Sequence, residues 1–473
     1  MTKPVRKSDI VELEIEDLVY GGNGIAHVND YVVFVEDCVP GQTVKTKVHK
    51  ATSSYAEAHP LKVLEKSPIE VEPECPYFDH CGGCNHQDIP YEKQIQFKKE
   101  QVENTYKNLG NFENIQIQTP LKLENNKFRY RNKMEFAFSP NRWLMNDFED
   151  YKPKNFALGL RPPGYYWKAI DLDDCVIAPQ ETEQVLHLVR KYTKENNLSL
   201  HDVRDHEGYL RHLMLRKGIN TNQLMINVVT NDNTPEKLEE LGEILKTKIP
   251  TLNSFINTYT ENKGGTTEPE QIHLLEGEKY ISDKIYNLEF RISSTSFFQT
   301  NTKMAEKLYS EIKAKSELSG EEIVWDLYSG TGSISLFLAD KAKKIIGFEL
   351  ASEAVEDAKV NAKVNNIENV EFLKGNLNKF FSKQPEIIEE LPDPDLIVLD
   401  PPRAGMHPQL LKDLCKIAPP KIVYVSCKPP TQVRDINKLA QEGYEINSIR
   451  PVDMFPQTAH IEVVTRLTKK NQE

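Results

Sequence analysis

The stretch from Leu396 to Cys427 constrains the fold more than any other part of this chain. Two short apolar runs, Leu396–Leu399 and Ile422–Val425, flank a segment with helical periodicity, Gln409–Ile417. Strand, helix and strand in this order predict a parallel βαβ unit. Asp400 follows the first run and Cys427 follows the second. Because ligands of open α/β sheets bind at the carboxyl ends of the strands, we expect both side chains to face one crevice.

A second strand-to-helix unit lies earlier, at residues 323–339, and reads IVWDLYSGTGSISLFLA. An apolar strand, a Gly-x-Gly turn and an apolar helix open a Rossmann-type fold. The third glycine of the dinucleotide fingerprint is missing, and the pattern matches the form that binds S-adenosylmethionine (AdoMet). Glu349 ends the next predicted strand, where its carboxylate can accept both ribose hydroxyls. Asn376 follows a third strand and can contact the adenine.

The residues around Asp400 and Cys427 restrict the atom that receives the methyl group. Arg403 follows Asp400-Pro401-Pro402 where enzymes that methylate exocyclic amines carry an aromatic ring. A thiol instead suits the ring carbon C5 of a pyrimidine, because a thiolate added at C6 makes C5 nucleophilic. A thiol with a pKa near 8.5 is only about 3% ionised at pH 7. The sequence neighbours Lys428 and Arg434 are the cations expected to favour the thiolate.

Such a reaction also needs a base that removes the C5 proton. The segment that ends at Val464 offers His460 and Glu462. Alternation along a strand places both side chains on one face, so spacing alone leaves both candidates open.

Cys75, Cys81 and Cys84 stand in a C-x5-C-x2-C arrangement, and Cys175 follows 91 residues after Cys84. In cytosolic proteins, spaced cysteines are more often metal ligands or nucleophiles than disulfides. Zinc sites usually have two CxxC knuckles, and this set has one. Four thiolates with a distant fourth ligand favour a structural [4Fe–4S] cluster, with zinc as the alternative.

The length of 473 residues predicts several domains. Residues 1–68 combine short apolar runs with glycine-rich turns, which predicts a small OB-like β-barrel. Residues 69–290 are expected to form a mixed α/β domain that holds the cysteine set. Its helix over Tyr91–Gly110 is expected to pack on the catalytic domain. Residues 291–473 are expected to form a Rossmann-like, class I AdoMet-dependent methyltransferase domain.

The net charge of −12 opposes indiscriminate coating of nucleic acid. Residues 121–170 differ locally, with ten Lys or Arg against five Asp or Glu, and eleven aromatic residues. Basic residues among stacking rings suit single-stranded RNA, whereas solvated strand edges are the alternative interpretation. The chain has neither a signal-peptide pattern nor an apolar run of about 18 residues, so we expect a cytoplasmic protein without a membrane contact.

Taken together, these motifs resemble the family of RNA (uracil-5-)-methyltransferases. The resemblance rests on DLYSGTGS, GFE, GN, LDPPRAG, VSC, HIE and CPYFDHCGGC. The start, GGNGIAH followed by YVVFVEDCVPGQTVKTKV, resembles a TRAM domain of RNA-modifying enzymes. Members of the RumA/RlmD type, which combine a TRAM domain with a [4Fe–4S] cluster, act on 23S ribosomal RNA, and relatives with this architecture that modify transfer RNA also exist.

The resemblance implies that Cys427 is the nucleophile and Glu462 the C5 proton acceptor. It implies cofactor contacts with AdoMet at six positions: Gln299, Tyr328, Ser333, Glu349, Asn376 and Asp400. Ser333 stands where some members have asparagine. The resemblance further implies methylation of C5 of a uridine, in a single-stranded or loop region of 23S rRNA, without an obligatory protein partner. The alternatives are the same reaction on tRNA and a non-catalytic RNA-binding factor of ribosome assembly.

Overall fold

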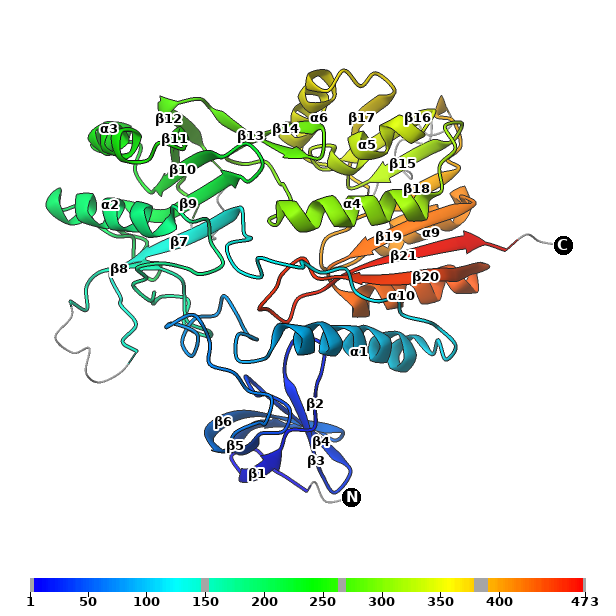
Figure 1. Ribbon diagram of the computed structural model, residues 1–473, viewed down its shortest axis with the longest axis horizontal. Coiled ribbons are helices and arrows are strands. Elements are labelled where there is room, and N and C mark those ends of the chain that lie inside the picture. Colours follow the sequence, from blue (N-terminus) through cyan, green and yellow to red (C-terminus); the bar gives the residue numbers. More distant parts are fainter. Residues whose placement is uncertain (1–3, 146–152, 263–268, 378–389, 471–473) are drawn as a thin grey trace.

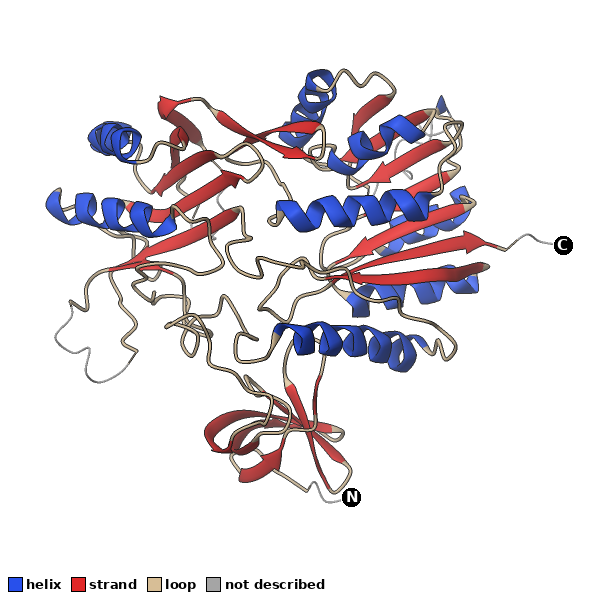
Figure 2. Cartoon of the chain, viewed as in Figure 1, coloured by secondary structure: helices blue, strands red, loops and turns tan. Residues whose placement is uncertain are grey.

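The computed structural model describes residues 4–145, 153–262, 269–377 and 390–470, and within these residues the strands form four sheets (Figures 1 and 2). The first sheet has the order β1-β5-β6-β4-β3-β2. Apolar side chains alternate along its strands, so Val33, Val35, Val44 and Val48 face inward and are fully buried. This sheet forms the predicted N-terminal barrel. Its strands are β1 (Ile10–Glu14), β2 (Asp17–Leu18), β3 (Gly24–Val28), β4 (Tyr31–Val35), β5 (Thr43–Ala51) and β6 (Tyr55–Glu65).

A long helix, α1 (Tyr91–Gly110), follows the barrel and the cysteine-bearing loop. Its buried face includes Ile95, Val102 and Tyr106, which lie at the spacing of a helical stripe. The helix packs against α10 (Pro429–Gln441) and β20 (Tyr444–Val452) of the C-terminal region, as Figure 1 shows. The expected packing of this helix on the catalytic domain is therefore confirmed.

The central sheet has the order β12-β11-β10-β9-β7-β8, and β10 and β11 are its one parallel pair among the described strands. Two helices and a short 3₁₀ turn accompany it, and a separate hairpin, β13–β14, leads to the C-terminal region. These elements are β7 (Lys133–Ser139), β8 (Ala157–Gly159), α2 (Thr182–Glu195), β9 (Leu210–Gly218), β10 (Gln223–Thr230), η2 (Pro235–Leu238), α3 (Glu239–Lys248), β11 (Leu252–Tyr259), β12 (Gln271–Gly277), β13 (Tyr280–Ile285) and β14 (Leu288–Ser293).

The C-terminal sheet has seven strands within the described residues, in the order β17-β16-β15-β18-β19-β21-β20. The strands from β17 to β19 are parallel, and β21 is antiparallel to both of its neighbours. The βαβ unit predicted between Leu396 and Cys427 is confirmed as β18, α9 and β19. The elements are α4 (Thr302–Ser316), β15 (Ile323–Leu327), α5 (Ser333–Leu338), η3 (Ala339–Lys341), β16 (Lys344–Glu349), α6 (Ser352–Val364), β17 (Val370–Lys374), β18 (Leu396–Leu399), α9 (Pro408–Ile417), β19 (Lys421–Ser426), α10, β20 and β21 (Glu462–Lys469).

The predicted domain boundaries at residues 68 and 290 stay predictions, and strand β14 runs across the second. Residues 146–152 of the basic and aromatic stretch lie outside the described residues. Among the described helices, none combines the length and the apolar character needed to cross a membrane.

Candidate active site

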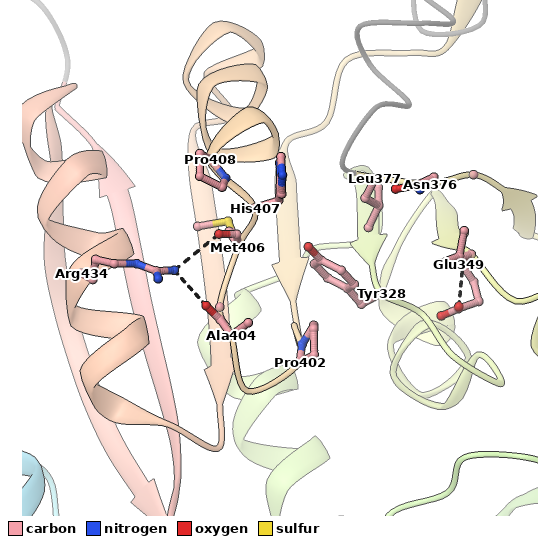
Figure 3. A pocket seen from close by; sticks show the side chains of 13 residues that line it. Tyr328, Glu349, Asn376, Leu377, Pro402, Ala404, Met406, His407, Pro408 and Arg434 are labelled. Atoms are coloured by element: carbon pink, nitrogen blue, oxygen red, sulfur yellow. Dashed lines mark hydrogen bonds between the residues drawn. The ribbon is translucent and has the colours of Figure 1, made fainter. Parts of the chain in front are cut away.

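A cavity of about 420 Å³ lies at the carboxyl ends of the parallel strands β15, β16, β17 and β18 (Figure 3). This is the edge at which open α/β sheets bind their ligands. The predicted residues Tyr328, Glu349 and Asn376 all line it. The other lining residues are Leu350, Gly375, Leu377, Pro402, Ala404, Gly405, Met406, His407, Pro408 and Arg434.

The Gly-x-Gly turn beside this cavity has a backbone that few side chains tolerate. The φ angles of Tyr328, Gly330 and Gly332 are 70°, 55° and 80°, all in the left-handed region. A Cβ on Gly332 would lie 2.6 Å from the Phe372 ring, whereas a Cβ on Gly330 would meet no atom within 4 Å. The turn is therefore packed on one side and open on the other, where a ligand can approach the backbone.

Hydrogen bonds hold the Glu349 carboxylate beside this turn. It accepts from the backbone N–H groups of Gly330 at 3.0 Å, Leu350 at 2.7 Å and Ala351 at 2.9 Å. Each carboxylate oxygen has more than one lone pair, so Glu349 can still accept from hydroxyl groups in the cavity.

The other three predicted AdoMet contacts do not line this cavity. The Ser333 and Tyr309 hydroxyls form a hydrogen bond of 2.8 Å with each other. Gln299 is buried in the segment after β14, and the Thr331 hydroxyl donates to the carbonyl of Phe297 in that segment at 3.2 Å. Asp400 lies partly buried at the end of β18.

Asp400, Cys427 and Glu462 belong to three neighbouring strands, and their charges influence one another. Burial, with a smaller contribution from the negative charges of Glu462 and Asp400, raises the pKa of the Cys427 thiol to about 11, against the opposing effect of Arg403. Burial also raises the pKa of Glu462 well above its usual value, and Asp400 adds to this rise. The structure thus brings together the thiol and the carboxyl groups that the sequence placed at strand ends.

The sequence neighbours Lys428 and Arg434 are not among the main charges that act on the Cys427 thiol. The positive charge that lowers the pKa of Cys427 belongs to Arg403, in the loop after β18. Arg434 instead donates to the carbonyl oxygens of Ala404 at 3.0 Å and Met406 at 3.4 Å (Figure 3). Sequence proximity pointed to Lys428 and Arg434, whereas Arg403 acts on the thiol through space from the loop after the adjacent strand β18.

The expectation that His460 and Glu462 share one face of a strand is also wrong, because β21 begins at Glu462. His460 precedes the strand, and its ring meets the Phe455 ring edge-on with centroids 6.0 Å apart. Burial, assisted by Arg403, lowers the pKa of His460 to about 4. His460 lines a separate cavity of about 340 Å³ together with Arg131 and Lys133.

The segment between β20 and β21, residues 453–461, is here called the C-terminal strap. Three parts of the chain bind it. The N–H groups of Asn85 and His86 donate to the Gln457 carbonyl at 3.0 and 3.1 Å. Gln94 of α1 exchanges two hydrogen bonds with Gln457, at 2.9 and 3.1 Å. Asn301 donates to the Met454 carbonyl at 3.0 Å. The strap that precedes Glu462 is therefore fixed by long-range contacts.

The four cysteines of the predicted cluster gather near one another as free thiols. Burial, with a smaller contribution from the other thiols of the set, raises the pKa of Cys81 and Cys84 to about 12. The Gly83 N–H donates to the Cys81 sulfur at 3.4 Å. Among the described residues, only Glu36, His49 and His59 bring three ligand atoms within 4.8 Å of one another, so no three of these sulfur atoms lie that close.

Comparisons with known proteins agree with this geometry. Residues 4–61 match the TRAM domain, and residues 220–470 match the tRNA (uracil-5-)-methyltransferase family. An uncharacterized RNA methyltransferase of Chlorobaculum tepidum is 40% identical over 97% of this chain and 96% of its own length. One of Clostridium tetani is 37% identical over 99% of each chain.

A solved structure resembles the whole chain. It is the Pyrococcus abyssi tRNA (uracil-54, C5)-methyltransferase in complex with S-adenosyl-L-homocysteine, with a TM-score of 0.74 and 26% identity. The likeness covers 97% of this chain and all of that one. With its family match over more than half of its length, the chain belongs to the tRNA (uracil-5-)-methyltransferase family and is an AdoMet-dependent RNA methyltransferase with an N-terminal TRAM domain.

Proposed function

We propose that this protein methylates C5 of a uridine in 23S rRNA through a covalent adduct between Cys427 and C6. The observation that carries the reaction is the convergence of Cys427, Glu462 and Asp400 at three neighbouring strand ends, beside the cavity of the Gly-x-Gly turn. AdoMet is the methyl donor and a substrate of the reaction.

In the proposed mechanism, the Cys427 thiolate adds to C6 of the uracil, and the electron pair of the C5–C6 double bond moves toward C5. C5 then attacks the methyl group of AdoMet, the bond between that methyl and the sulfonium sulfur breaks, and S-adenosyl-L-homocysteine leaves; the C5–H bond still has to break. Glu462 removes this proton, the C5–C6 double bond re-forms, and the thiolate leaves. The target base must first leave any stack or helix to reach the thiol.

Glu462 suits the role of base better than His460. A base works best when its pKa lies near the working pH, and burial raises the pKa of Glu462 toward that range. The pKa of His460 moves in the opposite direction, to about 4, which makes its imidazole a weaker base. Arg403 favours the charged forms of both Glu462 and Cys427.

We assign the methyl donor to the cavity of Figure 3. Glu349 accepts the ribose hydroxyls, because its carboxylate is already fixed by three N–H groups. Tyr328 and Asn376 line the same cavity and contact the adenosine part. Gln299, Ser333 and Asp400 remain proposed contacts with the methionine part, outside the residues that line the cavity. The complex of the Pyrococcus abyssi relative with S-adenosyl-L-homocysteine supports AdoMet as the methyl donor.

The cysteine set fits a [4Fe–4S] cluster better than zinc. Zinc holds sulfur at about 2.3 Å in a tetrahedron, which places sulfur atoms about 3.8 Å apart. No three of Cys75, Cys81, Cys84 and Cys175 have sulfurs within 4.8 Å of one another, so the described thiols are not gathered as tightly as a single zinc ion requires. An N–H group aimed at the Cys81 sulfur also suits cluster ligation. The cluster would tie the loop before α1 to the central sheet.

The basic and aromatic stretch supplies a surface for the unpaired RNA strand. Trp143 lies 4.8 Å from Tyr165, and Tyr165 lies 5.3 Å from Trp167, between ring centroids. The Lys168 ammonium lies 5.2 Å from the Trp143 ring, and Tyr166 is 64% exposed. Rings beside a cation bind bases by stacking with little sequence preference. With the TRAM barrel, this surface would hold the RNA around the flipped uridine.

Ribosomal RNA is the favoured substrate because the TRAM domain and the cysteine set together resemble those of the RumA/RlmD-type enzymes. Transfer RNA is the second candidate, since the Pyrococcus abyssi relative is named for uracil 54 of tRNA. The proposed cytoplasmic location and the lack of an obligatory protein partner rest on the sequence alone.

Tritium release from [5-³H]uridine in 23S rRNA and tRNA transcripts tests this proposal. We expect release from 23S rRNA with the wild-type enzyme and none with Cys427→Ala, which should still bind AdoMet. Tritium release from tRNA alone would show that tRNA is the substrate in place of 23S rRNA, and the proposed reaction would stand. Methyl transfer by Cys427→Ala would overturn the covalent route, and absence of release from every RNA would favour a non-catalytic assembly factor.

A further inference from the structure

We infer that Tyr20 of the TRAM barrel is a positioning residue for Cys427. This inference rests on the proposed role of Cys427 as the nucleophile. The Tyr20 hydroxyl donates a hydrogen bond of 3.1 Å to the carbonyl oxygen of Cys427, across 407 residues of sequence. Tyr20 lies in the turn between β2 and β3, which extends from the barrel toward the start of α1 (Figure 1).

The neighbouring backbone offers the Cys427 carbonyl no N–H group that could replace the Tyr20 hydroxyl as hydrogen-bond donor. Strand β19 ends at Ser426, so the Cys427 carbonyl lies beyond the ladder of that strand. Pro429 and Pro430 follow and carry no N–H group. The Tyr20 hydroxyl therefore fixes the peptide plane after the thiol, and with it the direction of the Cα–Cβ bond that carries the sulfur.

The Tyr20 side chain is well placed to keep this bond. Its ring is half-buried and packs against the apolar cluster of the catalytic sheet, which includes Ile461 and Val463. Burial, with a smaller contribution from the negative charge of Cys427, raises the pKa of Tyr20 to about 12. The hydroxyl thus keeps its proton, and remains a donor, throughout the neutral range.

The turn that carries Tyr20 is itself locked against the C-terminal strap. Gly22 has a φ of 90°, and a Cβ there would lie 2.8 Å from the Cβ of Ala459 and 3.3 Å from the His86 ring. Only glycine combines that conformation with so close an approach. The turn therefore touches the strap that leads to Glu462 while Tyr20 reaches the nucleophile.

The barrel side of the turn is anchored as well. Leu18 and Val39 of the barrel form a buried cluster with Ile89, against which Phe97 of α1 packs. Since α1 also packs on α10, the barrel is fixed to the catalytic sheet through apolar contacts that do not involve Tyr20. Removing the Tyr20 hydroxyl should consequently leave the barrel in place and disturb only the position of Cys427.

The test compares Tyr20→Phe with Tyr31→Phe in the full-length protein. Tyr31 is a matched control, because its hydroxyl also donates to a carbonyl, that of Thr52 at 2.9 Å, inside the barrel and away from Cys427. For Tyr20→Phe we expect kcat to fall about tenfold, with the KM values for RNA and AdoMet and the melting temperature unchanged. Adduct formation with 5-fluorouridine RNA should slow by the same factor. Tyr31→Phe should keep the wild-type kcat and rate of adduct formation.

Three outcomes separate this inference from the proposed function. If Tyr20→Phe raises only the KM for RNA or lowers only the melting temperature, Tyr20 serves barrel docking and the inference is wrong. If kcat and the rate of adduct formation in Tyr20→Phe equal those of the wild type, the inference about Tyr20 is also wrong. In that case an inactive Cys427→Ala variant would still support Cys427 as the nucleophile. If Cys427→Ala still transfers methyl groups, the proposed function itself fails.

Discussion

The Lys98 ammonium lies 2.5 Å from a carboxylate oxygen of Asp453, and neither side chain is exposed. Lys98 is in the middle of α1, and Asp453 is the first residue of the C-terminal strap. Tyr91 donates to the second carboxylate oxygen of Asp453 at 2.8 Å, and Lys98 also donates to the Phe455 carbonyl at 3.2 Å. The buried pair thus joins an N-terminal helix to the segment that precedes Glu462.

Lys98→Met should destabilise the protein by about 3–5 kcal/mol, because it leaves the Asp453 carboxylate buried without its cation. Urea unfolding followed by circular dichroism measures the change. Lys359→Met is the control, since its ion pair with Glu356 on α6 is largely exposed and its loss should leave the unfolding midpoint in place. Equal midpoints for both variants would contradict the structural role of the Lys98–Asp453 pair.

Glu462→Gln should trap a methylated adduct between enzyme and RNA, because the amide cannot take the C5 proton. The adduct should run as a heat-labile band of raised mass on a denaturing gel. Glu445→Gln, an exposed change on the adjacent strand β20, should turn over normally. Product release at the wild-type rate by Glu462→Gln would remove Glu462 from the role of base.

Alkylation of Cys427 by iodoacetamide should depend steeply on pH, since only the thiolate reacts. Burial raises the pKa of this thiol to about 11. In the free enzyme the rate should therefore rise about tenfold per pH unit from pH 7 to 9 without a plateau. Asp400→Asn removes a negative charge that raises this pKa, so alkylation at pH 8 should become faster. Peptide mass spectrometry measures both rates, and a plateau near pH 8.5 would contradict the buried setting of the thiol.

Protein purified without oxygen should contain about four iron and four sulfide per chain and absorb broadly in the visible range. Cys81→Ser and Cys175→Ser should lose most of the iron and melt at a lower temperature. Cys415→Ser, a change on helix α9, should keep the iron content and the melting temperature of the wild type. Stoichiometric zinc in place of iron would show that the thiols move closer together than the free protein holds them.

The local pattern of apolar residues predicted those helices and strands whose own sequence shows it. The apolar runs at Leu396–Leu399 and Ile422–Val425 became β18 and β19, and the stripe along Tyr91–Gly110 became α1. The order of the central sheet was not predicted, because it depends on pairing between distant segments, such as Lys133 with Arg216.

The same limit applies to the candidate active site. Glu349 ends the apolar strand β16, and Asn376 lies two residues after β17, so their place beside the cavity followed from the sequence. The charge of Arg403 acts on Cys427 from another strand end, and Tyr20 contacts Cys427 from another domain; no short motif encodes either interaction. A search for tyrosines beside glycine-rich turns would have singled out Tyr20 without identifying its acceptor.

Strand β21 lies between β19 and β20 although it follows both in sequence. During synthesis, β20 therefore emerges from the ribosome before its partner exists and must wait for the final strand to be inserted. A chain cut before Glu462 would lose an interior strand rather than a dispensable edge, and with it the carboxylate that begins that strand. Quality control by proteolysis should consequently remove truncated copies before they occupy RNA.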